Sequence, residues 1–311
     1  HDITAYPEIG LAAGACSGNG ILFDISDPLN PARLDEVVDP GFAYWLSATF
    51  NHDVTKVSYT AEWGGGGRAR WRASDPRQWG ANAIYDVIDG RFEYRSHYKL
   101  PAPQSETENC VAHNGSLVPV PGRDIMVQAW YQGGISVFDF TDSANPFEIA
   151  YFDRGPFDAE KIAMAGYWSA YWYRGFIYGT EIARGLDILE LLPSEFLTEN
   201  ELGAASVVAP ATFNAQDQRR TEWPGRPVVA RAYLDQLGPS NTLDAQQLTN
   251  FSALLDRADG AFAGVAEGGL AGDLSSAAEE MRREAVSVEG RNGNRLEALG
   301  EILERLADAV R

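Results

Sequence analysis

The sequence predicts a mainly β protein: a β-propeller of four-stranded blades, followed by a small α-helical bundle. Three observations lead to this fold class. A short apolar motif that ends in an Asp-rich turn occurs repeatedly within the first 191 residues. Aromatic residues and glycines are dense in the same part of the chain. After residue 226 the composition shifts to Ala, Leu, Glu and Arg, and the apolar residues take helical spacing.

The repeated motif is clearest in two segments, GILFDISDPLNP at residues 20–31 and GISVFDFTDSANP at 134–146. Shorter copies are AIYDVIDG at 83–90 and GLDILEL at 185–191. Each copy joins β-branched and aromatic residues, which favour strands, to a turn or to a short polar end. An acidic side chain recurs at one position of every copy, which indicates that it ties the turn to its neighbour. These side chains belong to Asp24, Asp86, Asp139 and Glu190.

Other strand-like segments surround each copy and give four strands per unit, at a spacing of roughly 45 to 67 residues that is typical of propeller blades. The innermost strands begin at His1, Leu46, His113 and Trp168. Outer strands are expected at 33–38, 92–100 and 147–152, and the fourth unit lacks one. The four blades either close a ring of their own or belong to a larger ring. The abrupt start at His1 and the lacking strand favour a missing N-terminal portion.

The domain boundaries follow from the same shifts in composition. Residues 1–192 are expected to form the blades, 193–226 a short helix and a polar linker, and 227–311 a helical module. Within the module, apolar residues recur at helical spacing in four runs. These runs are 228–237, 243–258, 270–285 and 294–310.

The charge limits the partners. The chain has 44 Asp and Glu against 25 Lys and Arg, a net charge of -19. A polyanion would be repelled, so a nucleic-acid partner is excluded, whereas Ca²⁺ or a cationic partner is compatible. No apolar run approaches the ~18 residues of a membrane span. Cys16 and Cys110 are too few for a disulfide scaffold, and they either pair, stay free or bond outside this chain.

The quoted repeats, together with CVAHNGS at 110–116 and GFIYGTEIARGLDILEL at 175–191, resemble the LVIVD-repeat proteins over about residues 1–195. The resemblance implies a β-propeller that is secreted or lies on the surface of a bacterium or archaeon. It also implies that Cys16 and Cys110 lack their usual partners, which would fall before His1 and at Trp71. Relatives tend to have His where this chain has Leu46, so a site built on that position is weakened.

The aligned strand starts suggest a candidate metal site. In a propeller these positions converge on the central channel, where His1 and His113 could hold a transition metal. Polar neighbours would surround it, namely Asp2, Ser47, Asn114 and Ser169. The alternative is a water-filled polar channel, because two protein ligands are fewer than stable sites generally have.

Three further groups are candidates for binding a ligand. Glu62 and Glu181 end equivalent strands and could bind Ca²⁺, or could accept hydrogen bonds from turn amides. Arg68 and Arg70 follow the glycine run 64–67, which lacks the Lys-Ser/Thr of a phosphate loop but could contact a ligand or partner. Trp45 and Trp168 could stack on sugar rings or pack between blades.

These observations favour a secreted or cell-surface protein that binds or scaffolds through loops on one propeller face, with a protein or glycan partner. One alternative is a channel metalloprotein or metalloenzyme that uses His1 and His113. Another is a structural subunit of an extracellular assembly, in which the chain associates with itself. An enzyme is not favoured, because neither Gly-x-Ser-x-Gly nor His-Glu-x-x-His occurs.

Overall fold

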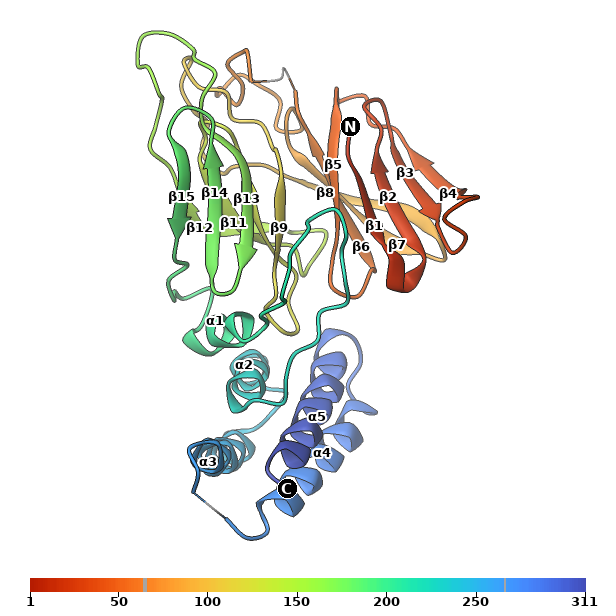
Figure 1. The fold of residues 1–311 in the computed structure, drawn as a ribbon, viewed down its shortest axis with the longest axis vertical. Coiled ribbons are helices and arrows are strands. Elements are labelled where there is room, and N and C mark those ends of the chain that lie inside the picture. Colours follow the sequence, from red (N-terminus) through yellow and green to blue (C-terminus); the bar gives the residue numbers. More distant parts are fainter. Residues whose placement is uncertain (64–65, 266) are drawn as a thin grey trace. The chain divides into compact units, whose positions relative to one another are not determined.

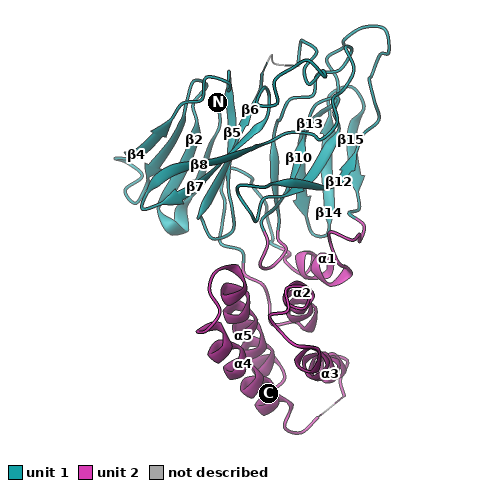
Figure 2. Ribbon diagram, turned by 180° about the vertical axis from the view of Figure 1, so that it is seen from behind, with its two compact units in different colours: residues 1–118, 124–191, 210–221 teal, residues 119–123, 192–209, 222–311 magenta. Residues whose placement is uncertain are grey.

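The structure is a computed structural model that describes residues 1–63, 66–265 and 267–311 (Figure 1). The chain forms two compact units (Figure 2). Unit 1 comprises His1–Val118, Asp124–Leu191 and Pro210–Thr221. Unit 2 comprises Pro119–Arg123, Leu192–Ala209 and Glu222–Arg311. The four sheets belong to unit 1, and the five α-helices of the described chain belong to unit 2.

The four antiparallel sheets are the blades of a four-bladed β-propeller, which confirms the predicted fold class. In every blade, strands that follow one another in the chain pair as neighbours. Blade 1 is β1 (Ile3–Tyr6), β2 (Leu11–Ala15), β3 (Gly20–Asp24) and β4 (Ala32–Val37). Blade 2 is β5 (Trp45–Phe50), β6 (Lys56–Ala61), β7 (Asn82–Ile88) and β8 (Arg91–Tyr98). Blade 3 is β9 (Gly115–Val118), β10 (Ile125–Ala129), β11 (Ile135–Asp139) and β12 (Phe147–Phe152). Blade 4 is β13 (Tyr167–Tyr173), β14 (Phe176–Glu181) and β15 (Gly185–Leu189), without an outer fourth strand, as predicted.

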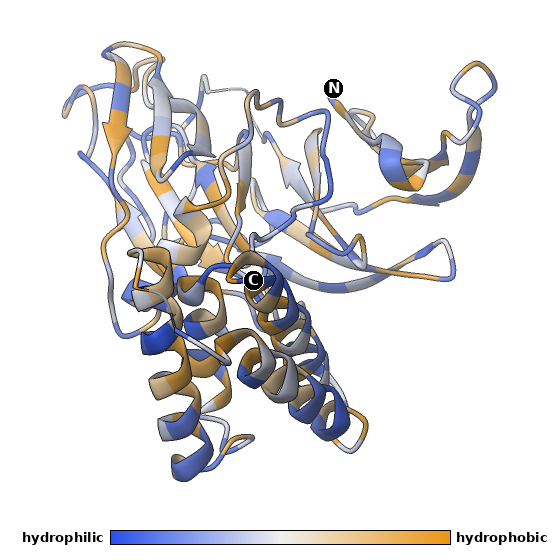
Figure 3. Cartoon of the chain, turned by 60° about the horizontal axis from the view of Figure 1, so that its bottom comes forward, coloured by the Kyte–Doolittle hydropathy of each residue, from blue (hydrophilic) through white to orange (hydrophobic). Residues whose placement is uncertain are grey.

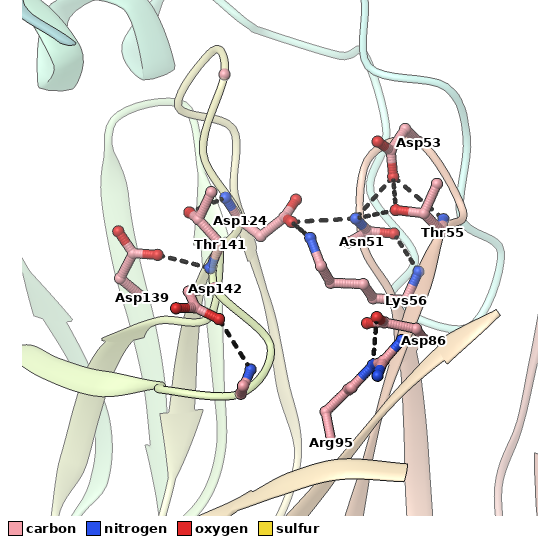
Figure 4. Close-up of polar contacts among 12 residues, drawn as sticks. Asn51, Asp53, Thr55, Lys56, Asp86, Arg95, Asp124, Asp139, Thr141 and Asp142 are labelled. Carbon is pink, nitrogen blue, oxygen red and sulfur yellow. Dashed lines mark hydrogen bonds and ion pairs between the residues drawn. The ribbon is translucent and has the colours of Figure 1, made fainter. Parts of the chain in front are cut away.

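The recurring acidic residue has the structural role that the repeats predict. Asp24 accepts a hydrogen bond from the Ser26 amide at 2.8 Å, and Asp139 accepts one from the Thr141 amide at 2.7 Å. In blade 2, Asp86 instead binds the Arg95 guanidinium, with 2.6 Å between Oδ2 and Nε (Figure 4). Carboxylates that accept the amide two residues on are typical of Asx turns. Asp24 and Asp139 therefore end their strands in Asx turns, whereas Asp86 lies within β7 and pairs with a residue of β8.

Buried aromatic side chains and direct hydrogen bonds join neighbouring blades. Trp45 is fully buried between blades 1 and 2, with its ring centroid 5.0 Å from that of Tyr59. Between blades 2 and 3, Lys56 Nζ lies 2.7 Å from Asp124 Oδ2, and Figure 4 shows the two side chains meeting. Because a propeller sheet can bury its faces only against its neighbours, these junctions make up much of the core of unit 1.

Lys99 occupies an unusual position at the junction of blades 2 and 3. Its side chain is 2% exposed, and its ammonium donates to the carbonyls of Gly80 and Cys110 at 3.0 and 2.6 Å. The rings of Trp71 and Trp130 lie 5.4 and 5.2 Å from the same nitrogen. Burial lowers the pKa of Lys99 to about 7, because desolvation disfavours the charged form.

Residues 210–221, here called the closing segment, were predicted to be linker, but they lie in unit 1 between the last blade and the first. At the fourth blade, the Tyr173 hydroxyl donates to the carbonyl of Ala211 at 3.2 Å. At the first blade, the Ala5 amide donates to the Gln216 carbonyl, and the Gln218 amide donates to the Ala5 carbonyl, both at 2.9 Å. The Gln218 side chain also bonds both backbone polar groups of Phe50 in blade 2, at 2.8 and 3.0 Å.

Unit 2 is the predicted helical part. Its helices are α1 (Glu199–Ser206), α2 (Pro227–Leu237), α3 (Ala245–Phe262), α4 (Leu270–Ala285) and α5 (Arg291–Ala309). Capping boxes begin α1 at Thr198 and α3 at Asp244. Figure 3 shows hydrophobic and hydrophilic residues on the same helices, and the apolar ones, such as Leu274, Leu299 and Leu303, form one buried core. Among the described residues, no helix is long and apolar enough to span a membrane.

We expect Gln218→Ala to lower the free energy of unfolding by about 1–3 kcal/mol, because it removes two hydrogen bonds and leaves the Phe50 backbone groups unpaired. Arg219→Ala is the matched control, since Arg219 is mostly exposed and pairs only with Asp217 at 3.1 Å in the described structure. Urea unfolding followed by tryptophan fluorescence measures both variants. Equal stability of the two variants would show that the closing segment does not hold the blades.

Lys99 should make the stability of unit 1 depend on pH. Its pKa lies near 7 in the folded chain and near 10.5 in the unfolded one, so the unfolded state binds more protons between these values. The unfolding free energy of the wild type should therefore rise between about pH 7 and pH 10.5, relative to Lys99→Met. The control is Lys161→Met, which removes an exposed lysine. Parallel pH profiles of wild type and Lys99→Met would contradict the lowered pKa.

Candidate functional site

One face of the propeller carries the longer connections between strands. The chain returns to this face, here called the loop face, after every second strand of a blade and between successive blades. Its connections include residues 38–44, 62–81, 99–114 and 153–166, whereas most turns on the other face are short. Binding residues of propellers and other scaffolds are disproportionately found on such loops. The predicted residues His1, Glu62, His113 and Trp168 all belong to this face.

His113 lies at the mouth of the channel, just before β9, and its side chain is 1% exposed. Its amide donates to the Ala129 carbonyl at 2.9 Å, and its own carbonyl accepts from the Gln128 side chain at 2.9 Å, so its backbone is held on both sides. The ring Nδ1 lies 2.5 Å from the carbonyl oxygen of Trp168. A carbonyl only accepts hydrogen bonds, so Nδ1 carries the proton and Nε2 presents a lone pair.

The Nε2 atom of His113 is buried and has no hydrogen-bond partner in the described structure. Burial lowers the pKa of His113 to about 4, chiefly because the charged imidazolium would lose its hydration. The imidazole is therefore neutral near pH 7 and can only accept a hydrogen bond at Nε2. An unsatisfied buried acceptor costs free energy, and such atoms are few in folded proteins.

Glu62 faces this nitrogen from the end of blade 2. Its Oε1 lies 3.7 Å from His113 Nε2, too far for a hydrogen bond. The Tyr131 hydroxyl donates a short hydrogen bond to the same oxygen. The amide of Glu62 donates to the Tyr44 carbonyl at 2.9 Å, which holds the backbone in place. Burial raises the pKa of the Glu62 carboxyl, and the nearby charge of Asp2 raises it further.

Aromatic rings complete the cluster of His113, Glu62, Tyr131 and Trp168, here called the mouth cluster. The imidazole packs edge-on against Tyr131, with centroids 4.9 Å apart and planes at 82°. Trp168 contacts both rings, with its centroid 4.3 Å from the imidazole and 5.7 Å from that of Tyr131. The Trp168 side chain is 43% exposed, whereas Tyr131 is fully buried. The cluster thus exposes one indole at the loop face and holds its acceptor atoms beneath the surface.

Glu181 positions this cluster and does not face it. Its buried carboxylate accepts hydrogen bonds from the amides of Gly166, at 2.6 Å, and of Arg184. Gly166 has φ +94°, and a Cβ there would lie 2.0 Å from the carbonyl carbon of Tyr131. Only glycine allows the chain to approach so closely before it turns into β13 and presents Trp168. Glu181 therefore has the turn-binding role that was the alternative to Ca²⁺ binding.

Below the mouth, polar side chains line the channel. Asp2, Ser47 and Asn114 lie around a small hollow, together with Tyr171 of β13 and with Gln216 of the closing segment. The expected convergence of the innermost strands is thus observed. Ser169 lies at the same level, paired with Asn114 through a parallel β-bridge. Burial raises the pKa of Asp2, although the positive N-terminus opposes this shift.

The remaining predicted residues lie outside the mouth cluster. Trp45 is fully buried between blades, so its ring packs the core and offers no surface for a sugar. Arg68 is exposed, and Arg70 lies over the ring of Trp79 at 5.8 Å. The ring of Trp79 stacks on that of Trp63, with 4.6 Å between centroids, so aromatic packing holds the connection 62–81 in place. Residues 64–65 of the glycine run lie outside the described residues.

The predicted metal site pairs His1 with His113, but in the structure each of these histidines has a carboxylate as its neighbour. His1 is exposed, and its Nδ1 lies 2.7 Å from Asp2 Oδ1, whereas the neighbour of His113 Nε2 is Glu62. Within the described part of the chain, no group of three or more His, Cys, Asp and Glu side chains is arranged to hold a metal ion. Cys16 and Cys110 are both free thiols.

Sequence reasoning missed Tyr131 and the pairing of Glu62 with His113. Glu62 was aligned with Glu181 and His113 with His1, because the repeats relate equivalent positions of different blades. The pairing joins non-equivalent positions, one at the end of a second strand and one before a first strand. Only the juxtaposition of neighbouring blades in space brings them together.

These features define the class of the protein: a four-bladed β-propeller whose central channel opens among long loops, with a helical unit after it.

No protein-family model matches the chain, and no curated protein does. The chain is similar to the solved structure of the computationally designed Ika4 protein, at 11% identity and a TM-score of 0.38, over 59% of this chain and 86% of that one. It is also similar to a Lactobacillus plantarum protein, at 12% identity and a TM-score of 0.43, over 61% and 53% of the two chains. For apo AztD from Citrobacter koseri the identity is 10% and the TM-score 0.30, over 59% and 46%. The chain thus spans about half the length of the last two.

We expect the His113 imidazole to remain neutral, with its proton on Nδ1, between pH 8 and pH 5. Its folded pKa near 4 lies below the unfolded value of about 6.5, so its contribution to stability should fall as the pH drops from about 6.5 to about 4. Two-dimensional ¹H–¹⁵N spectra of the histidine rings report both tautomer and charge, and His113→Gln assigns the signal. A His113 ring that titrates near pH 6.5, or carries its proton on Nε2, would contradict this geometry.

Proposed function

We propose that the protein is a binding module that recognises its partner through the loop face, with the mouth cluster at the centre of the contact. The observation that carries the proposal is the buried, unpartnered Nε2 of His113 beside the exposed indole of Trp168. A buried acceptor without a partner is costly, and an arriving donor would remove that cost. Exposed aromatic rings supply contact area at a low entropic cost, which makes them frequent anchors of interfaces.

The arrangement supports recognition more than catalysis. His113 is neutral and has a carbonyl at Nδ1, and its nearest carboxylate does not reach hydrogen-bonding distance. The described cluster offers no hydroxyl or thiol nucleophile next to this imidazole, since the Tyr131 hydroxyl is bonded to Glu62. The resemblance to secreted and surface propellers supports an extracellular location, with a protein or a glycan as the partner.

The face can be tested with two matched aromatic variants in blade 4. Trp168 lies at the loop face and is 43% exposed, whereas Phe176 begins β14 at the other face and is 44% exposed. The labelled protein would be applied to arrays of glycans and peptides. We expect Trp168→Ala to weaken the strongest binding by about tenfold or more, since aromatic anchors often contribute over 1.4 kcal/mol.

Phe176→Ala should leave the same binding unchanged. Loss of binding in Phe176→Ala with retention in Trp168→Ala would place the contact on the other face and refute the proposal. Circular dichroism of both variants checks that the blades remain folded.

A further inference from the structure

The polar atoms of the mouth cluster are nearly all acceptors. His113 Nε2 has a lone pair, Glu62 has a carboxylate, and the Tyr131 hydroxyl uses its hydrogen on Glu62. The Asp2 carboxylate adds negative charge nearby, although it already lies beside His1 and the positive N-terminus. A ligand that satisfies such a group of atoms must bring donors.

We propose that the mouth cluster binds an alkylammonium group, such as the side chain of a lysine on a partner protein, between His113 Nε2 and Glu62 Oε1. This inference rests on the proposed function, because it assigns a ligand class to the same site. The two atoms are 3.7 Å apart. Nε2 is buried in the chain without a ligand, so the neighbouring side chains must move aside to admit the group. One nitrogen at a hydrogen-bond distance of about 2.9 Å from each atom then bridges that separation.

The aromatic rings favour a cation at the same place. The face of an indole ring attracts an ammonium group within about 6 Å of its centroid, and the attraction grows when the site is partly dehydrated. Trp168 contacts the His113 ring directly, at 4.3 Å between centroids, so the indole belongs to the same site.

The electrostatics point in the same direction. His113 is uncharged at neutral pH, so it does not repel a cation. The Glu62 carboxyl has a raised pKa because it is partly buried, and an adjacent ammonium would stabilise its ionised form. The net charge of -19 attracts cationic partners over longer distances. A sugar is a poorer match, because each hydroxyl both donates and accepts, and the described cluster has only the Trp168 indole N–H as a donor beside its acceptors.

The experiment uses the full chain and calorimetric titration with Nα-acetyl-lysine N-methylamide. The matched ligand is the norleucine analogue, which has the same carbon chain without the amine. We expect the lysine compound to bind at least tenfold more tightly than the norleucine compound, because a charge-assisted hydrogen bond contributes to its affinity. Free 1-aminopentane and a lysine-centred pentapeptide form two further arms. Tighter binding of the peptide identifies a protein partner, and equal binding identifies a small amine.

Glu62→Gln should weaken the lysine compound about tenfold, since the carboxylate loses its charge. Glu190→Gln, on the exposed end of blade 4, makes the same change in net charge and should have no effect. Equal loss in both variants would mean that only the long-range field matters and would overturn the proposal. Equal affinity for the lysine and norleucine compounds, or no binding of either, would also overturn it.

A measurement on the wild-type chain covers the case in which Glu62→Gln does not fold. The ¹⁵N signal of His113 Nε2 should shift when the lysine compound is added and stay unchanged with norleucine. An unchanged signal at saturating lysine compound refutes the site. If array ligands still depend on Trp168 while the lysine compound does not bind, the alkylammonium inference fails and the proposed function stands.

Discussion

The convergence of four innermost strands on one axis is the constraint on which the rest of unit 1 depends. These strands bring Asp2, Ser47 and Asn114 to the same hollow, although the residues are far apart in the chain. Direct hydrogen bonds hold this arrangement, such as the bond from the Asp2 amide to the Leu46 carbonyl at 2.8 Å. Most side chains at this hollow are small and polar, and many bulky residues such as Trp45 pack between the blades. In the mouth cluster, His113 and Trp168 lie at the starts of innermost strands, whereas Glu62 and Tyr131 follow second strands that end at the same face.

Most of the fold could be predicted because the blades repeat. The strand motifs at 20–31 and 134–146 have β-branched and aromatic residues followed by Asp-rich turns, and both become the third strand of a blade and its turn. The lacking outer strand of blade 4 was predicted for the same reason. The helices of unit 2 followed from apolar spacing alone. The closing segment could not be predicted, because it joins blade 1 through a single isolated β-bridge between Ala5 and Asp217, which is too short to give an alternating pattern.

The candidate site was predicted only in part. Glu62, His113 and Trp168 were singled out separately, and the structure places them together. Glu181 and Trp45 have the structural roles that were their alternatives, since both are buried, Glu181 accepts hydrogen bonds from backbone amides, and Trp45 packs against neighbouring rings. What decides between the roles is burial and the identity of the neighbour across a blade junction. Neither quantity can be obtained from a strand pattern, which gives only the alternation within one sheet.

The closing segment also constrains how the protein folds. Blades 1 to 4 are complete at residue 189, but the residues that hold the fourth blade against the first come later, after helix α1. The contact between Ala5 and Gln216 joins positions separated by most of the chain, and such contacts form slowly because a long loop must close first. During synthesis the blades emerge one by one and can dock in sequence. The channel therefore takes its final form only after residues 210–221 have emerged from the ribosome and docked on both the fourth blade and the first.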